Sequence, residues 1–234
     1  MSLRRARPWR ITAPMSFSHV TTWIFDLDNT LYPPEAALFS QIEKRMTAHV
    51  TRILGVSPVE ADRLRKHYWR DYGTTLAGLM AEHAIDPHAY LLDVHDIDFS
   101  VLTPAPDLCA AITALPGRKI IHTNADKAYA ERVLDQLGIG PFEAICGIEE
   151  VSFHPKPDAR AYAAVIDAHG IDPATAAMFE DDPRNLAVPA SLGMQTVLVG
   201  LGRHGPDELL ADHDHGAHVQ HKTDDLTAFL RSLV

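Results

Sequence analysis

Short apolar runs that alternate with helical patterns narrow the possible folds of this sequence more than any other feature. Four runs, each bounded by polar or glycine-containing turns, are typical of buried parallel strands: residues 20–25, 119–121, 176–179 and 196–199. Residues 143–148 form a weaker fifth candidate. Between these runs, apolar residues recur at helical spacing, and two such patterns end at Gly138 and Gly170. Strands that alternate with helices predict an α/β fold with a parallel sheet.

The interval between the first two predicted strands departs from this alternation, because it contains no convincing strand. One helical stripe there ends at Gly55 and consists of Leu38, Ile42, Met46, Val50 and Leu54. Further helical patterns cover residues 59–72 and 76–83, with 90–94 as a fourth candidate. We therefore expect three parts. They are an N-terminal extension at 1–18, a core made of 19–33 and 104–234, and a helical insertion at 34–103.

The composition of the 234-residue chain excludes several classes of protein. Its 46% hydrophobic and 22% charged residues are typical of a globular protein, and its formal charge of −10 argues against a general nucleic-acid groove. No apolar run approaches the ~20 residues that a membrane helix needs. Cys109 and Cys146 lack the spacing of a disulfide framework or a zinc site. We expect a cytoplasmic protein with neither nucleic acid nor membrane as a partner, and the oligomeric state stays open.

Acidic and polar side chains follow three of the predicted strands where these strands end. The segments are D-L-D-N-T at 26–30, T-N at 123–124 and E-D-D at 180–182. Because open parallel sheets bind ligands beyond the carboxyl ends of their strands, we expect these segments to meet in one crevice. Several carboxylates in one crevice favour a bound cation, and their hard oxygen atoms favour Mg²⁺.

Two aspartates, Asp26 and Asp28, lie two positions apart at the end of the first predicted strand. Such a pair suits a nucleophile and a general acid/base, because one side chain can face the reacting atom while the other reaches the leaving group. Taken alone, a D-x-D sequence is more often a turn or a fragment of a calcium loop. Together with the other polar segments at the ends of the predicted strands, however, the pair is better explained as part of an active site.

Two further segments offer groups that suit a phosphate. Lys156 lies between two prolines just before a helical pattern at 158–169, so its ammonium group can be aimed at the crevice. A lysine in such a turn is otherwise usually a solvated surface residue. Thr123 and Asn124 precede a helix that begins near Asp126, where a hydroxyl and free backbone N–H groups can cradle a phosphate. An ordinary helix cap is the alternative for these two residues.

The order of these segments, with D-L-D-N-T followed by T-N, K-P and E-D-D-x-x-N, resembles the haloacid dehalogenase-like phosphohydrolases over residues 26–185. The resemblance implies a Rossmann-like α/β core with a parallel sheet and an inserted all-helical cap of the C1 type. It also implies Mg²⁺-dependent hydrolysis of a phosphomonoester through an aspartyl-phosphate. By this resemblance Asp26 is the nucleophile and a Mg²⁺ ligand through its carboxylate. Asp28 is then the acid/base and binds Mg²⁺ through its main-chain carbonyl.

The same resemblance gives roles to the remaining segments. Thr123 and Lys156 would act in catalysis by binding the phosphoryl group, together with Asn124, and Asp181 would bind the metal. The family commonly has Gly-Asp where this chain has Glu180-Asp181, and often Asp where it has Asn185. Glu180 and Asn185 are therefore expected only as auxiliary metal ligands.

Three segments in and near the insertion resemble the pyrimidine 5'-nucleotidase branch of the family: Tyr32-Pro33, residues 70–76 and residues 95–98. This similarity covers nearly all of residues 20–200, although His122 stands where an aromatic residue is expected. It implies a small phosphorylated metabolite as substrate, namely a pyrimidine nucleoside 5'-monophosphate. Tyr72, Thr74 and His95 are then candidates for contacts with the nucleoside, and packing or helix capping is the alternative for each.

Other activities could use the same core residues. Within the family, the alternatives are a phosphatase for sugar phosphates or other small metabolites and a phosphomutase similar to β-phosphoglucomutase. A dehalogenase is disfavoured, because a departing halide does not need the acid that Asp28 provides. A receiver-like switch that stores an aspartyl-phosphate would also need acids, Thr, Lys and Mg²⁺. Such a switch has no use for Asp28 as a proton donor or for a helical insertion.

Overall fold

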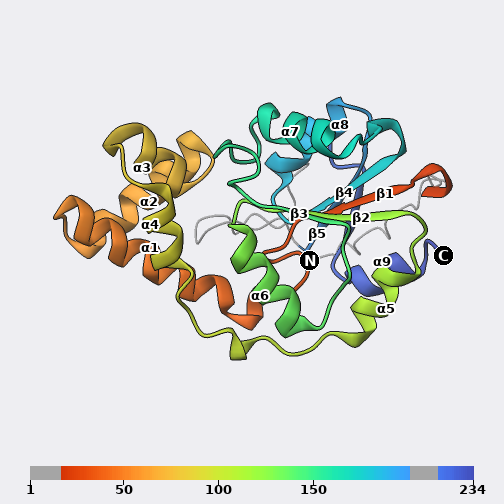
Figure 1. Ribbon diagram of the computed structural model, residues 1–234, viewed down its shortest axis with the longest axis horizontal. Coiled ribbons are helices and arrows are strands. Elements are labelled where there is room, and N and C mark those ends of the chain that lie inside the picture. Colours follow the sequence, from red (N-terminus) through yellow and green to blue (C-terminus); the bar gives the residue numbers. More distant parts are fainter. Residues whose placement is uncertain (1–16, 201–215) are drawn as a thin grey trace, which may run out of the picture.

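The computed structural model describes residues 17–200 and 216–234, and within these ranges it confirms the predicted α/β fold. One six-stranded parallel sheet has the strand order β3-β2-β1-β4-β5-β6 (Figure 1). The strands are β1 (Thr22–Phe25), β2 (Arg118–His122), β3 (Ala144–Cys146), β4 (Ala176–Glu180), β5 (Gln195–Val199) and β6 (His221–Thr223). Residues 1–16 of the predicted N-terminal extension lie outside the described residues.

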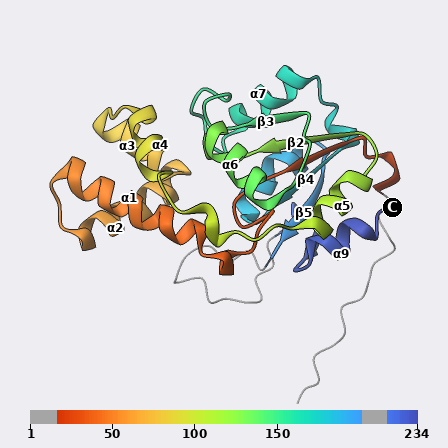
Figure 2. The ribbon, with the colours of Figure 1, turned by 60° about the horizontal axis from the view of Figure 1, so that its bottom comes forward.

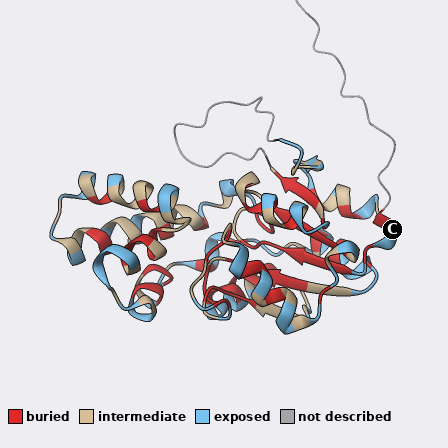
Figure 3. Cartoon of the chain, turned by 90° about the horizontal axis from the view of Figure 1, so that it is seen from above, coloured by how far each residue is buried: buried red, intermediate tan, exposed pale blue. Residues whose placement is uncertain are grey.

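The central strands correspond to the apolar runs of the sequence, because helices cover both faces of the sheet. Helices α7 (Ala159–His169) and α8 (Ala187–Ser191) lie on one face (Figure 1). The opposite face carries α5 (Pro106–Ala114), α6 (Lys127–Leu137) and α9 (Leu226–Arg231). Every residue of β1 and β4 is buried, and Figure 3 shows the buried residues concentrated along the strands. A strand buried on both faces reads as a continuous apolar run.

Strand β6 and helix α9 were not expected from the sequence. Strand β6 pairs with β5 at the edge of the sheet, with Val197 beside His221, and its residues are half-buried or exposed. A three-residue edge strand with the sequence H-K-T has neither an apolar run nor an alternation that sequence analysis could detect. Its place in the sheet depends on pairing with β5 alone.

Four helices between β1 and β2 form a lobe beside the sheet, which we call the cap (Figure 2). They are α1 (Leu38–Leu54), α2 (Pro58–Tyr72), α3 (Thr75–His83) and α4 (Pro87–Val94). Helix α1 buries Leu38, Ile42 and Val50 and ends at Gly55, which has a positive φ of 65°. Helices α2 and α3 approach closely, because a Cβ atom on Gly78 would lie 2.4 Å from the Tyr68 side chain. Within the described residues, no helix has both the length and the apolar character needed to cross a membrane.

Candidate active site

Lys156 lies at the centre of the side chains that gather beyond the carboxyl ends of β1, β2 and β4. Its Nζ atom donates to Asp26 Oδ1 at 2.6 Å, to Glu180 Oε2 at 2.7 Å and to the carbonyl oxygen of His122 at 2.8 Å. Only 1% of Lys156 is exposed, so it is not a solvated surface residue. Burial alone would lower the pKa of Lys156, but the carboxylates of Asp26 and Glu180 raise it, and the ammonium group stays charged.

Asn124 fixes the backbone that carries Lys156. Its Oδ1 accepts a hydrogen bond from Lys156 N at 2.8 Å, and its Nδ2 donates to Lys156 O at 3.2 Å. Thr123 is also buried, and its Oγ1 accepts a hydrogen bond from Ala125 N at 3.1 Å. The structure therefore places Asn124 beside Lys156, and Thr123 directly follows His122, whose carbonyl oxygen accepts from Lys156 Nζ. The contact of either residue with a phosphoryl group stays a prediction.

The nucleophile candidate, Asp26, is held by the sheet itself. Its backbone N–H donates to Phe179 O at 2.9 Å, which continues the pairing of β1 with β4 by one residue. Thr30 Oγ1 donates to Asp26 Oδ2 at 3.2 Å, and Lys156 occupies Oδ1. A buried carboxylate fixed by a cation and a hydroxyl has little freedom to rotate, which suits attack along one direction.

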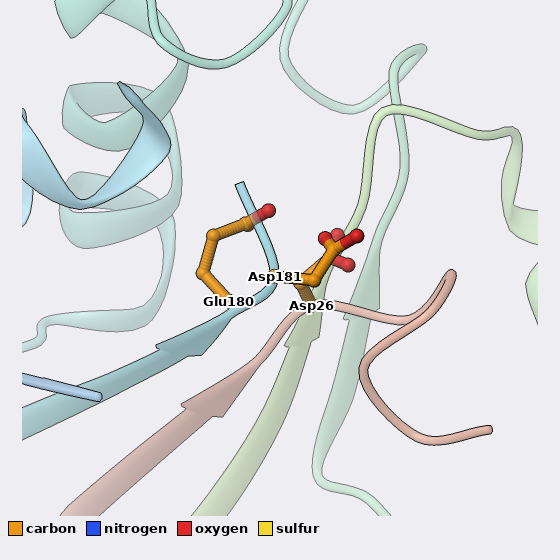
Figure 4. Close-up of side chains that lie close together, drawn as sticks. All are labelled: Asp26, Glu180 and Asp181. Atoms are coloured by element: carbon orange, nitrogen blue, oxygen red, sulfur yellow. The ribbon is translucent and has the colours of Figure 1, made fainter. Parts of the chain in front are cut away.

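Three carboxylates form a possible metal site. One oxygen each from Asp26, Glu180 and Asp181 lies within 4.8 Å of the others, and Figure 4 shows these side chains at the ends of neighbouring strands. Burial and the neighbouring carboxylates raise the pKa of Glu180 to about 7 and hold the pKa of Asp181 well above its usual range. A cation at this point would relieve that repulsion.

The ligand atoms that this cluster offers fit Mg²⁺ in their chemistry, since carboxylate oxygens are hard ligands. Asn185 donates through Nδ2 to Glu180 Oε1 at 3.0 Å. Its Oδ1 atom is buried and has no hydrogen-bond partner among the described residues. Asn185 therefore offers one further oxygen near the cluster, and its role as an auxiliary ligand stays a prediction.

Asp28 is held by two tyrosines that the sequence did not point to as site residues. Its Oδ1 accepts hydrogen bonds from Tyr32 Oη at 2.5 Å and Tyr129 Oη at 2.6 Å. Burial and the carboxylate of Asp26 raise the pKa of Asp28, although both phenols and His95 oppose this shift. A raised pKa favours the protonated form, which a general acid needs.

The comparisons with known proteins identify the family of this chain. A family model described as haloacid dehalogenase-like hydrolase matches residues 20–193, a span that includes β1, the cap, Lys156 and the acidic cluster. The chain belongs to this family of hydrolases.

Two relatives are similar in sequence to most of this hydrolase. Validoxylamine A 7'-phosphate phosphatase of Streptomyces hygroscopicus subsp. limoneus is 26% identical over 204 residues, which are 82% of this chain and 90% of the relative. Phosphate metabolism protein 8 of Saccharomyces cerevisiae is 27% identical over 194 residues, or 75% of this chain. The match spans only 60% of the length of the yeast protein.

Solved structures share the fold of this hydrolase. L-2-haloacid dehalogenase from Xanthobacter autotrophicus aligns with a TM-score of 0.55 at 16% identity, over 91% of this chain and 97% of its own. A putative β-phosphoglucomutase from Thermotoga maritima aligns with a TM-score of 0.56 at 19% identity, over 92% of this chain and all of its own. At these identities the likeness concerns the fold alone.

Of the three residues predicted to contact a nucleoside, two have hydrogen-bond partners within the cap of the hydrolase and one has a partner in the core. The Tyr72 hydroxyl donates a hydrogen bond to Glu82, and Thr74 Oγ1 accepts one from Ala77 N at 3.1 Å. Both hydrogen bonds lie within the cap. The turn between them nevertheless lies against the core, because a Cβ atom on Gly73 would be 3.3 Å from Lys156 O. The role of Tyr72 and Thr74 in specificity stays a prediction.

His95, the third of these residues, joins the cap of the hydrolase to the core. It follows the last residue of α4, and its Nδ1 lies 2.5 Å from Asp126 Oδ2. Its ring stacks on Tyr129 with 4.2 Å between the ring centroids. The His95 side chain thus has partners in the core, and its predicted contact with a nucleoside stays untested.

A second contact joins the cap to the loop that follows β4. The guanidinium group of Arg184 lies 3.7 Å from the centroid of the Trp69 ring in α2. The same guanidinium pairs with Asp182 at 2.6 Å, one residue beyond Asp181 of the acidic cluster. Helix α2 is therefore in contact with the segment that carries the predicted metal ligand.

His122 stands where the family resemblance predicted an aromatic residue, and its side chain faces an apolar cavity. The ring is 2% exposed, and Nε2 has no hydrogen-bond partner among the described residues. The cavity is lined by Ile24, His122, Tyr162, Val165, Ile166, Met178 and Met194. Burial and the charge of Lys156 hold the pKa of His122 well below its usual range.

Replacing His122 with Phe is expected to raise the free energy of unfolding by about 1–3 kcal/mol, since it removes a buried polar atom without a partner. The native state resists protonation of His122, whereas the unfolded state binds a proton below about pH 6.5. The wild type therefore loses stability as the pH falls through this range, and the advantage of the variant grows. Denaturant unfolding at pH 7.5 and 5.5 measures both effects, with His19→Gln at an exposed position as the control. A variant less stable than the wild type at both pH values would contradict the prediction.

Proposed function

We propose that this hydrolase is a Mg²⁺-dependent phosphatase that acts on a small phosphomonoester through an aspartyl-phosphate on Asp26. One observation carries the proposal: the Asp26 carboxylate is buried 2.6 Å from the ammonium group of Lys156, beside an acidic cluster and two residues before Asp28. The relative from Streptomyces hygroscopicus, which is named as a validoxylamine A 7'-phosphate phosphatase, supports the same reaction class. Residues 34–103 are the proposed cap domain, and 19–33 with 104–234 the proposed catalytic core.

In the first half-reaction, a carboxylate oxygen of Asp26 attacks the phosphorus atom. The new P–O bond forms as the bond between phosphorus and the leaving alcohol breaks. Asp28 gives its proton to the alcohol oxygen, so the alcohol leaves neutral and Asp28 becomes ionised. The ammonium group of Lys156 offsets negative charge on the phosphoryl oxygens as the two anions meet.

In the second half-reaction, a water molecule attacks the phosphorus atom of the aspartyl-phosphate. Asp28 accepts a proton from this water as the new P–O bond forms. The P–O bond to Asp26 then breaks, inorganic phosphate leaves, and both carboxyl groups return to their starting states. Asn124, which is hydrogen-bonded to the Lys156 backbone, and the neighbouring Thr123 are the proposed partners of the remaining phosphoryl oxygens.

Mg²⁺ would be held by Asp26, Asp181 and the main-chain carbonyl of Asp28, with Glu180 and Asn185 as auxiliary groups. When bound, it supplies positive charge next to the nonbridging phosphoryl oxygens and so permits the approach of a carboxylate.

The proposal is tested by phosphate release from p-nitrophenyl phosphate, nucleoside monophosphates and sugar phosphates, each in the presence of Mg²⁺. A phosphatase gives steady turnover with at least one of these substrates. A receiver-like switch would release at most one equivalent of the leaving alcohol per chain and would keep the phosphoryl group on the aspartate. A parallel assay of halide release from 2-chloropropionate addresses the dehalogenases, whose fold this chain shares. Halide release without phosphate release would overturn the proposal.

Within the phosphatases, we propose a pyrimidine nucleoside 5'-monophosphate as the substrate. The proposed catalytic residues of the core contact only the phosphoryl group, which all monoesters share. Discrimination between substrates must therefore come from the cap. The turn that holds Tyr72, Gly73 and Thr74 packs at Gly73 against the Lys156 loop, which supports a role for these cap residues near the proposed phosphate position. A phosphatase for sugar phosphates and a phosphomutase remain the alternatives, since they would use the same core.

UMP and CMP are therefore expected to exceed AMP and GMP in kcat/KM by at least about 10-fold, since a polar pocket rejects a base that leaves its groups unpaired. Tyr72→Phe should narrow this ratio and leave the hydrolysis of p-nitrophenyl phosphate largely intact. Tyr68→Phe is the matched control, because Tyr68 lies on the same helix and its hydroxyl bonds to His83 within the cap. If purine nucleotides or sugar phosphates are the better substrates, the pyrimidine assignment is wrong and the phosphatase assignment stands.

A further inference from the structure

We propose that Tyr32 and Tyr129 are positioning residues that leave Asp28 only one oxygen for proton transfer. Their phenols occupy one carboxyl oxygen of Asp28, so the other must carry the proton and deliver it to the leaving group. This inference rests on the proposed function, in which Asp28 is the general acid and base.

Both phenols converge on the same atom. Tyr32 Oη donates to Asp28 Oδ1 at 2.5 Å and Tyr129 Oη donates to it at 2.6 Å, while the two hydroxyl oxygens lie 3.3 Å apart. A carboxyl oxygen has two lone pairs, and two donors use both of them. No other described residue hydrogen-bonds to the Asp28 side chain, so Oδ2 is the oxygen that can hold a proton.

The two tyrosines are themselves held firmly, and from different parts of the chain. Tyr32 lies four residues after Asp28 and is 3% exposed. Tyr129 comes from the first turn of α6 and is 1% exposed, and its backbone N–H donates to the capping side chain of Asp126 at 2.7 Å. Buried phenols would lose their partner if Asp28 rotated, which makes rotation unfavourable. The Asp28 carboxyl group is thus fixed in direction.

The ring of Tyr129 is supported from the cap side by His95. The two rings stack with an interplanar angle of 22°, and His95 is tied to Asp126, the residue that caps α6. Phe99 packs on Tyr129 with 5.7 Å between the ring centroids. This support accounts for the place of Tyr129 without requiring any contact between His95 and a substrate.

The test compares a leaving group that needs a proton with one that does not. Tyr129→Phe removes one donor and lets the carboxyl group of Asp28 rotate, but it preserves the packed ring. In single-turnover experiments with enzyme in excess, release of uridine from UMP should slow by about 10-fold to 10²-fold. Release of p-nitrophenolate from p-nitrophenyl phosphate should change less than about 3-fold, since this anion leaves without protonation. The KM for UMP should stay close to its wild-type value, and Tyr32→Phe should give the same pattern.

Asp28→Asn serves as the reference for a double-mutant cycle. In this background Tyr129→Phe should have no further effect on UMP, because it acts only through Asp28. Tyr90→Phe is the matched control, since Tyr90 is also a buried tyrosine but its hydroxyl has no hydrogen-bond partner among the described residues. This control should leave both rates unchanged.

Two results would overturn the inference while the proposed function stands. One is an equal loss of rate for UMP and p-nitrophenyl phosphate in both Tyr→Phe variants, which indicates a role in packing. The other is an undiminished effect of Tyr129→Phe on the Asp28→Asn background. If Asp28→Asn itself leaves uridine release unchanged, the acid role of Asp28 in the proposed function is wrong, and the inference fails with it.

Discussion

Asp26→Asn is expected to lower kcat for every phosphomonoester by at least about 10⁴-fold, because a carboxamide cannot form the aspartyl-phosphate. The amide still accepts a hydrogen bond from the ammonium group of Lys156, which also remains paired with Glu180. The loss should therefore concern the chemistry more than the fold. Steady-state phosphate release measures kcat, and mass spectrometry of acid-quenched enzyme detects the phosphorylated chain in the wild type alone.

The control for this substitution is Asp107→Asn, which makes the same change at an exposed aspartate paired with Arg231 on the far side of the core. It should retain wild-type turnover. Near-normal turnover of Asp26→Asn, or a phosphorylated chain in that variant, would show that another residue is the nucleophile.

Removal of divalent metal by a chelator is expected to abolish turnover, and added Mg²⁺ should restore it. The carboxylates of Asp26, Glu180 and Asp181, of which the first two are buried and the third is half-buried, repel one another, and Lys156 supplies a single positive charge among them. Asp181→Ala removes one ligand and should lower activity by at least about 10²-fold at a Mg²⁺ concentration that saturates the wild type. Activity as a function of Mg²⁺ concentration measures the loss.

A second readout separates loss of metal binding from loss of catalysis. Because a ligand of the native state stabilises it, added Mg²⁺ should raise the Tm of the wild type and have little effect on Asp181→Ala. Asp224→Ala, at an exposed position, is the control and should respond as the wild type does. Turnover that persists after exhaustive chelation would falsify the metal site.

Much of the fold could be predicted from the sequence, because many of its elements are encoded by local patterns. The helical stripe from Leu38 to Leu54 ends at Gly55, and α1 has these bounds. The apolar runs of β1 and β4 are followed by the acidic segments, and parallel pairing of these strands is sufficient to bring Asp26 beside Glu180 and Asp181. Once the strands are assigned, the topology of the sheet determines where their carboxyl ends meet.

The parts that could not be predicted depend on contacts between segments with no local signal. Tyr129 lies 101 residues from Asp28 and reads from the sequence as one more apolar residue of a helical stripe. Only the place of α6 beside the loop that follows β1 reveals that the Tyr129 hydroxyl meets a carboxylate. His95 was predicted as a substrate contact, and its stacking on Tyr129 likewise depends on how the cap meets the core.

The pairing of Trp69 with Arg184 makes one indole sensitive to the arrangement of the two lobes. Of the two tryptophans within the described residues, Trp23 is buried in the sheet and donates to Pro116 O at 2.6 Å, far from the cap. Trp69 lies beneath a guanidinium group that belongs to the other lobe and is paired with Asp182. Indole emission responds to a nearby charge, so any movement of α2 away from this loop changes the fluorescence of Trp69 and leaves that of Trp23 unaffected. The protein thus carries an intrinsic optical probe at the boundary between cap and core, and no label has to be attached.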